Sequence, residues 1–218
     1  MDFIKIKKEL LLKKSKEEIE QIESIESFDV LKLASMGSDD SEGYQIFTPD
    51  FVVEDMVKRL GLKLVTDFAK TILEPTSGDG AFTTHILLLR LQKALKDKNN
   101  GFEINSLKAL STIYSIEMDK SLILKQRNNI LTVFKLFGET NNIKFPDGFL
   151  DVVKIMIQSN FIWAMFNADE PVSMLFADVA FKMPEAENNN FKPLDFPVWE
   201  ISESNIDFRM EGVDIEYD

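Results

Sequence analysis

The residues whose types and spacing could support chemistry gather around a short glycine turn. In the segment LEPTSGDGAF, Gly78 and Gly80 follow a short aliphatic run and precede a helix-like stretch. Glycines let a ligand approach the backbone closely, and the first turn of a helix offers unpaired N–H groups. Glu74 ends the aliphatic run, and Glu117 ends the next such run, within YSIEMD, where an acid can accept both hydroxyls of a ribose. The pattern predicts a nucleotide-binding site.

Other kinds of catalytic or metal site have little to build on. The chain contains no cysteine, which excludes disulfides, thiolate metal sites and cysteine nucleophiles. His85 is the single histidine, so a histidine metal cluster and a Ser-His-Asp triad are both disfavoured. It lies inside a predicted helix, and we interpret it as a packed or solvent-facing side chain. We therefore expect no metal.

Strand-like and helix-like segments alternate through the middle of the chain. Their hydrophobic periodicity predicts a mixed α/β domain with a mostly parallel sheet and helices on both faces. The expected strands are 71–74, 109–116, 160–166 and 174–181, and the expected helices are 81–97, 119–137 and 147–159. We interpret 185–195 as a loop and expect short strands in VWEIS and IDFRMEG of the tail.

The first part of the chain is predicted to be separate from this domain. Apolar residues recur at helical spacing among Lys and Glu over 1–35, and a polar linker, MGSDDSEG, follows at 36–43. We expect an N-terminal helical extension and linker over 1–42 and a domain over 43–218. The charged run is a solvated helix face in this interpretation, although the helix could also pair with another protein.

Charge and hydropathy restrict the partners. With 25 Lys and Arg against 37 Asp and Glu, the formal net charge is -12, whereas a domain that grips DNA by itself usually carries a basic face. No apolar run reaches transmembrane length, and the first residues lack the pattern of a signal peptide. We expect a cytoplasmic protein that does not bind a membrane.

Three segments together resemble a known family. LEPTSGDGAF resembles motif I of S-adenosylmethionine-dependent methyltransferases, D/E-P-x-x-G-x-G-x-F/L, and YSIEMD resembles motif II. YQIFTP resembles the F/Y-x-T-P motif that precedes motif I in N6-adenine DNA methyltransferases, especially the modification subunits of restriction systems. The resemblance covers about residues 43–135, and it implies a class I methyltransferase (Rossmann-like) fold and a role in DNA methylation within a restriction–modification or mobile-element system.

The resemblance also implies a set of cofactor-binding residues. Glu74 would face the methionine amino group, Glu117 would hold the ribose hydroxyls, and Met118 would flank the adenine. The segment 47–49 would close over the methionine end. The residues placed around S-adenosylmethionine are Phe47, Thr48, Pro49, Glu74, Pro75, Gly78, Asp79, Gly80, Phe82, Glu117 and Met118.

The catalytic loop of that family has no clear counterpart. Adenine N6 methylation acts on a flipped-out base, which the family holds with a D/N/S-P-P-Y/F/W loop. This chain has no Pro-Pro pair and reads ADVAFKMPEAE where the loop is expected. The candidates are Asn188 and Phe191, in NNNF, and Asp195, in DFP. Met165 stands where an acid contacts the cofactor adenine in the family, and Asn167 or Asp169 could substitute for it.

Three functions remain open at this point. The chain could be an adenine-specific DNA methyltransferase, or the catalytic subunit of one, that reaches DNA through a partner subunit because it has no room for a target-recognition domain. It could be a non-catalytic accessory or structural subunit, which the missing Pro-Pro loop favours. An NAD-dependent enzyme shares the sheet, but Thr83 replaces the third glycine of its fingerprint.

Overall fold

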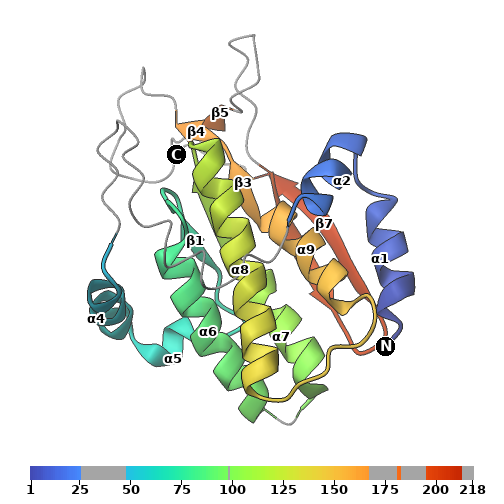
Figure 1. Ribbon diagram of the computed structural model, residues 1–218, viewed down its shortest axis with the longest axis horizontal. Coiled ribbons are helices and arrows are strands. Elements are labelled where there is room, and N and C mark those ends of the chain that lie inside the picture. Colours follow the sequence, from blue (N-terminus) through green and yellow to red (C-terminus); the bar gives the residue numbers. More distant parts are fainter. Residues whose placement is uncertain (26–47, 98, 167–180, 183–194, 213–218) are drawn as a thin grey trace, which may run out of the picture.

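The chain folds into alternating helices and strands over its middle part (Figure 1). The structure is a computed structural model that describes residues 1–25, 48–97, 99–166, 181–182 and 195–212. The helices are α1 (Phe3–Leu11), α2 (Lys16–Glu23), α4 (Asp50–Leu60), α5 (Leu62–Val65), α6 (Ala81–Lys96), α7 (Gly101–Ser111), α8 (Lys120–Thr140) and α9 (Phe149–Asn160). The strands are β1 (Ile72–Glu74), β2 (Ile113–Glu117), β3 (Phe161–Trp163), β4 (Met165–Phe166), β5 (Phe181–Lys182), β6 (Asp195–Ile201) and β7 (Ile206–Gly212).

Three strands form a small parallel sheet in the order β1-β2-β3. Glu74 at the end of β1 is paired with Ser115, and Glu117 at the end of β2 is paired with Trp163. The carboxyl ends of the strands therefore meet at one edge, where loops can build a site. The predicted mixed α/β fold with a parallel sheet is confirmed. The pairs β4–β5 and β6–β7 are antiparallel.

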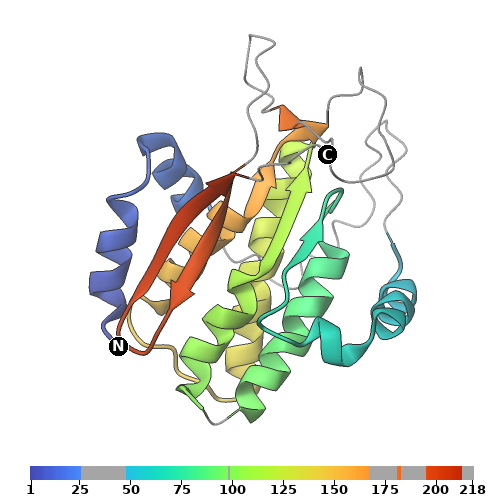
Figure 2. The same ribbon diagram turned by 180° about the vertical axis from the view of Figure 1, so that it is seen from behind.

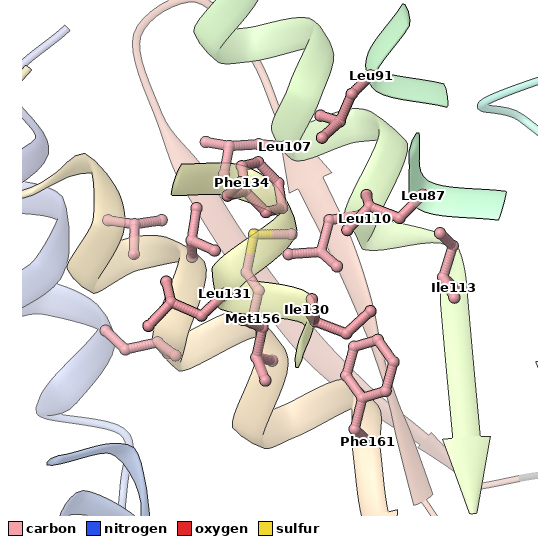
Figure 3. Packing of buried hydrophobic residues seen from close by; sticks show 14 of the residues in the cluster. Leu87, Leu91, Leu107, Leu110, Ile113, Ile130, Leu131, Phe134, Met156 and Phe161 are labelled. Carbon is pink, nitrogen blue, oxygen red and sulfur yellow. The ribbon is translucent and has the colours of Figure 1, made fainter. Parts of the chain in front are cut away.

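The hydrophobic core lies where α6, α7, α8 and α9 meet the sheet (Figure 3). The contributing side chains come from these four helices and from β2 and β3, together with residues of α1, α2, α4, α5 and β7, and each is fully buried or nearly so. Figure 3 labels Leu87, Leu91, Leu107, Leu110, Ile113, Ile130, Leu131, Phe134, Met156 and Phe161. This shared core fixes α6 and α8, the two helices that flank the glycine turn.

The two faces of the sheet are covered by different kinds of element. Ser115 faces α8, because its hydroxyl donates to the Gln126 side chain at 3.0 Å. Its neighbour Tyr114 must point to the opposite face, since side chains alternate along a strand. There the Tyr114 hydroxyl donates to the Pro197 carbonyl at 2.6 Å, and its ring lies edge-on to Phe196. The β6–β7 hairpin thus packs on the face opposite α8 (Figure 2).

A buried arginine fixes the approach to β1. Arg90, on α6, is fully buried and donates to backbone carbonyls of the segments that precede β1 and β2. Its Nε bonds the Val65 carbonyl at 2.8 Å, and its Nη2 bonds the Lys70 carbonyl at 2.8 Å. Its Nη1 bonds the Thr112 hydroxyl at 2.7 Å. The guanidinium thereby joins the segment before β1 to the segment before β2.

The N-terminal segment packs on the domain as two helices. α1 begins after Asp2, whose side chain accepts from the Lys5 N–H, and α2 begins with a capping box between Ser15 and Glu18. Both helices pack against α9, and the Phe3 ring meets Phe149 edge-on at 5.3 Å. Both helices lie within the segment 1–42 that was predicted to be a helical extension and linker, and residues 12–15 separate them.

Some predicted elements differ from the structure. Residues 109–111 belong to α7, and β2 starts only at Ile113, so the predicted strand 109–116 began too early. The run ALSTIYSI reads as one β-rich segment, but buried side chains at Leu107 and Leu110 continue a helical spacing that α7 follows. The predicted strand 174–181 and the loop 185–195 lie almost entirely outside the described residues.

Candidate functional site

The glycine turn connects β1 to α6 through two residues in the left-handed region. Gly78 has φ +57° and Gly80 has φ +90°, values that glycine adopts without strain. A Cβ at Gly80 would lie 2.5 Å from Gln126 Cγ, whereas a Cβ at Gly78 would meet nothing within 4 Å. Gly80 is therefore required for packing against α8, and the turn is open only at Gly78.

Glu117 ties the turn to the end of β2. Its Oε2 accepts from the Gly78 N–H at 2.7 Å, and its Oε1 accepts from the Asp119 N–H at 2.9 Å. The side chain is buried, with 8% exposed. A carboxylate has about four acceptor positions, so each oxygen keeps a second lone pair. The structure thus brings the predicted residues Gly78 and Glu117 into direct contact.

The buried side-chain amide of Gln126, on α8, forms hydrogen bonds with residues on either side of the glycine turn. Gln126 Oε1 accepts from the Ser77 hydroxyl at 2.9 Å, and its Nε2 donates to the Thr83 hydroxyl at 2.8 Å. The same Oε1 also accepts from Ser115. Sequence reasoning did not identify Gln126. The signal available in the sequence was the position of Gln126 at helical spacing between the apolar residues Ile123 and Ile130.

Asp79, between the two glycines, is directed toward α8. Its carboxylate lies 3.1 Å from Lys125 Nζ, and its carbonyl accepts from the Asn129 side chain at 3.0 Å. These bonds hold the loop against the helix that follows β2. Asp79 therefore serves to position the turn in this structure.

Glu74 carries the most perturbed carboxyl of the site. Its Oε2 is buried and has no hydrogen-bond partner among the described residues. Burial raises the pKa of Glu74 to about 8, because the charged form loses hydration and nothing replaces it. A buried acceptor without a donor is costly. The side chain is suited to meet a hydrogen-bond donor or a cation that a ligand brings.

The remaining predicted cofactor residues are spread around this centre. Pro75 and Phe82 are half-buried on either side of the turn, and Phe82 packs against the core. Met118 is 65% exposed, and its carbonyl accepts from the Trp163 indole N–H at 3.0 Å. Thr48 and Pro49 precede α4, which packs against α6.

Of the predicted catalytic candidates, Asp195 is the one that lies within the described residues. Asp195 starts β6, where it is exposed and paired with Gly212. It lines a cavity whose described walls include no residue of the glycine turn. Phe47, Asn167, Asp169, Asn188 and Phe191 lie outside the described residues.

Comparison with models of protein families, with curated proteins and with solved structures finds no match for this chain. Among the residues that the structure describes, no group of three His, Cys, Asp or Glu could hold a metal ion. No helix in the described ranges is both long enough and apolar enough to cross a bilayer. The site is therefore interpreted from its own geometry.

Proposed function

We propose that this chain binds S-adenosylmethionine at the carboxyl edge of β1 and β2. In this proposal it is a methyltransferase-fold protein related to the N6-adenine DNA methyltransferases of restriction–modification or mobile-element systems. The observation that carries the proposal is the Glu74 carboxyl at the end of β1, whose buried Oε2 has no partner among the described residues, in the strand that leads into the turn at Gly78, where a Cβ would meet nothing within 4 Å. A carboxyl and an open stretch of backbone suit a ligand that carries an ammonium group and lies against the turn. When bound, the cofactor supplies a methyl group on a sulfonium.

The residues present fit the parts of this cofactor. Glu74 would pair with the methionine ammonium, which gives the buried oxygen its missing donor. The second lone pairs of Glu117 would accept from the two ribose hydroxyls while the bond to the Gly78 N–H is kept. The exposed Met118 side chain would cover the adenine.

Methyl transfer to DNA is proposed to require a partner. A chain of net charge -12 repels a polyanion on average. We therefore propose that DNA is reached through a partner subunit and that this chain is inactive alone. Transfer to adenine N6 rests on the resemblance of three sequence motifs.

A second candidate function is that of an accessory or structural subunit that binds no cofactor. One observation favours it: both Glu117 oxygens already accept backbone hydrogen bonds, and Gln126 holds the turn from below. The turn is thus held together by the chain itself. A ligand titration separates the two candidates.

The test is calorimetric titration with S-adenosylmethionine near pH 7 and near pH 8.5. Since the pKa of Glu74 is about 8, its ionised fraction should rise about eightfold between these conditions, and the contribution of its carboxylate to the affinity should rise with it. Glu74→Gln should lose this rise and bind about tenfold more weakly near pH 8.5, because it lacks the charge.

Glu139→Gln, an exposed change on α8, serves as the matched control and should behave as the wild type. The variant comparison also removes any contribution from the ligand's own amino group. No heat from the wild type at either pH would favour the accessory subunit. Binding with the same pH dependence in Glu74→Gln would show that another group pairs with the ligand.

A further inference from the structure

A cavity of about 540 Å³ lies along β3, on the side that faces α2 and the hairpin. Its described lining comes from the α1–α2 region, α8, α9, β3, β6 and β7, and includes no residue of the glycine turn or of β2. These elements lie together on the side of the molecule that carries α1 and α2 (Figure 1). Sites for small molecules commonly measure about 300–1,000 Å³. The volume is therefore that of a ligand site.

A buried cation forms part of the lining. Arg127, on α8, is 4% exposed. Its Nε and Nη2 donate to the Phe161 carbonyl at 3.0 and 2.7 Å, and its Nη1 donates to Gln21 Oε1 at 3.2 Å. These acceptors are neutral, and among the described residues no carboxylate forms an ion pair with Arg127. A buried charge is costly unless it is paired.

The electrostatics of Arg127 agree with this geometry. Burial lowers the pKa of its guanidinium to about 10, because desolvation disfavours the charged form. A guanidinium has five N–H donors, and Nη1 keeps one hydrogen beyond its bond to Gln21. An anion in the cavity would receive that hydrogen and compensate the charge.

A buried acceptor without a partner lies beside this cation. Gln158, on α9, is 8% exposed, and its Oε1 has no hydrogen-bond partner in the described part of the chain. Its backbone carbonyl accepts from Arg127 Nη2 at 3.4 Å, which places the two residues next to each other. Both line the cavity. Two neighbouring residues of the lining thus each have an unmet requirement, a hydrogen-bond donor for Gln158 and an anion for Arg127.

Apolar, aromatic and charged side chains form the rest of the cavity lining. Ile162, Trp163 and Phe208 are half-buried and give the cavity apolar and aromatic walls. The Lys14 side chain is only 5% exposed. Its Nζ lies 4.9 Å from the Phe208 ring centroid and 2.9 Å from the Glu18 carboxylate. Asp195 is exposed and forms part of the mouth. Flat apolar groups suit such walls.

We propose that this cavity binds a small organic molecule that carries an anionic group, an aromatic body and a hydrogen-bond donor. The anion faces Arg127, the donor meets Gln158 Oε1, and the ring lies against Trp163 and Phe208. An aromatic amino acid and a nucleoside monophosphate both have this chemistry. The site shares no described residue with the glycine turn, so it goes beyond the proposed cofactor site and does not depend on it.

The test uses calorimetric titration of the full chain with L-tryptophan, with adenosine 5′-monophosphate and with inorganic phosphate. We expect one of the two aromatic probes to bind and phosphate alone to bind much more weakly, because it lacks the ring. The first aromatic probe represents a carboxylate source and the second a nucleotide source. No binding of either aromatic probe at millimolar concentration overturns the proposal.

Two variants locate the binding. Gln158→Glu places a carboxylate beside Arg127, so it compensates the buried charge and repels an anion. We expect binding at least about tenfold weaker, with a melting temperature equal to or above that of the wild type. Gln92→Glu makes the same chemical change on the exposed face of α6 and should leave binding unchanged. Ile162→Phe narrows the cavity at β3 and should also weaken binding, even if Gln158→Glu fails to fold. Binding that neither cavity variant weakens lies elsewhere and contradicts the proposal.

Discussion

Replacing Glu74 with glutamine should change how the stability of this protein depends on pH. The pKa of Glu74 is about 8 in the folded chain, against an ordinary value of 4.5. Between these values the folded state holds a proton that the unfolded state has released. Stability therefore falls as pH rises through this window and levels off above pH 8. Glutamine has no such proton, so the variant should not show this loss.

The magnitude follows from the two pKa values. One pH unit corresponds to about 1.4 kcal/mol, so the interval from 4.5 to about 8 gives an upper limit of about 5 kcal/mol. Glu74 is half-buried and only its Oε2 is fully enclosed, so solvent screens part of the penalty. We expect the variant to gain about 2–3 kcal/mol over the wild type between pH 5 and pH 8.5.

Urea denaturation at several pH values measures this difference directly. Other titrating groups are shared by both proteins and cancel in the comparison. Glu139→Gln, which removes one exposed negative charge, controls for net charge and should show a constant difference. A Glu74→Gln effect that is the same at pH 5 and pH 8.5 would refute the reasoning, because the Glu74 carboxyl would then be solvated or paired.

Two glycine predictions follow from the close contacts of the fold. Gly80→Ala should destabilise the protein by about 1–3 kcal/mol in urea denaturation, because its Cβ would meet Gln126 Cγ at 2.5 Å. Gly78→Ala has open space around the new Cβ, so it should lose about 1 kcal/mol or less, from the positive φ alone. Equal losses in the two variants would contradict the packing argument. Gly148→Ala would place a Cβ 2.9 Å from the backbone of Phe3 and Ile4. We therefore expect α1 to detach and trypsin to cut at Lys7 and Lys8 faster than in the wild type. An unchanged cleavage rate would show that the packing of α1 does not depend on its close contact with Gly148.

Local patterns predicted the elements around the glycine turn because they depend on nearby residues. The aliphatic run before Glu74, the two glycines and the amphipathic stretch after them indicated β1 and α6 with nearly correct bounds. Glu117 was placed at a strand end because a short apolar run precedes it. The boundary at Thr112 was missed because β-branched residues there continue a strand-like pattern, while tertiary packing of Leu110 extends the helix.

Properties that depend on distant residues could not be predicted in this way. The role of Gln126 requires Ser77, Ser115 and Thr83 to converge on it from separate elements. The unpaired state of Glu74 depends on what surrounds it in space. The cavity beside β3 is built from segments near residues 13, 127, 158 and 208, which no sequence spacing connects.

The N-terminal helices have a consequence for the order in which this protein can assemble. Lys13 pairs with Asp207, 194 positions away, and Lys7 pairs with Asp151 at 2.8 Å. During translation, α1, α2 and the residues that join them are therefore synthesised long before α9 and β7, which this segment contacts. Such non-local pairing slows folding. The apolar residues of α1 therefore stay without their packing partners until the later elements have emerged. The cavity that α2, α9 and the hairpin line is thus completed only after β7 has emerged.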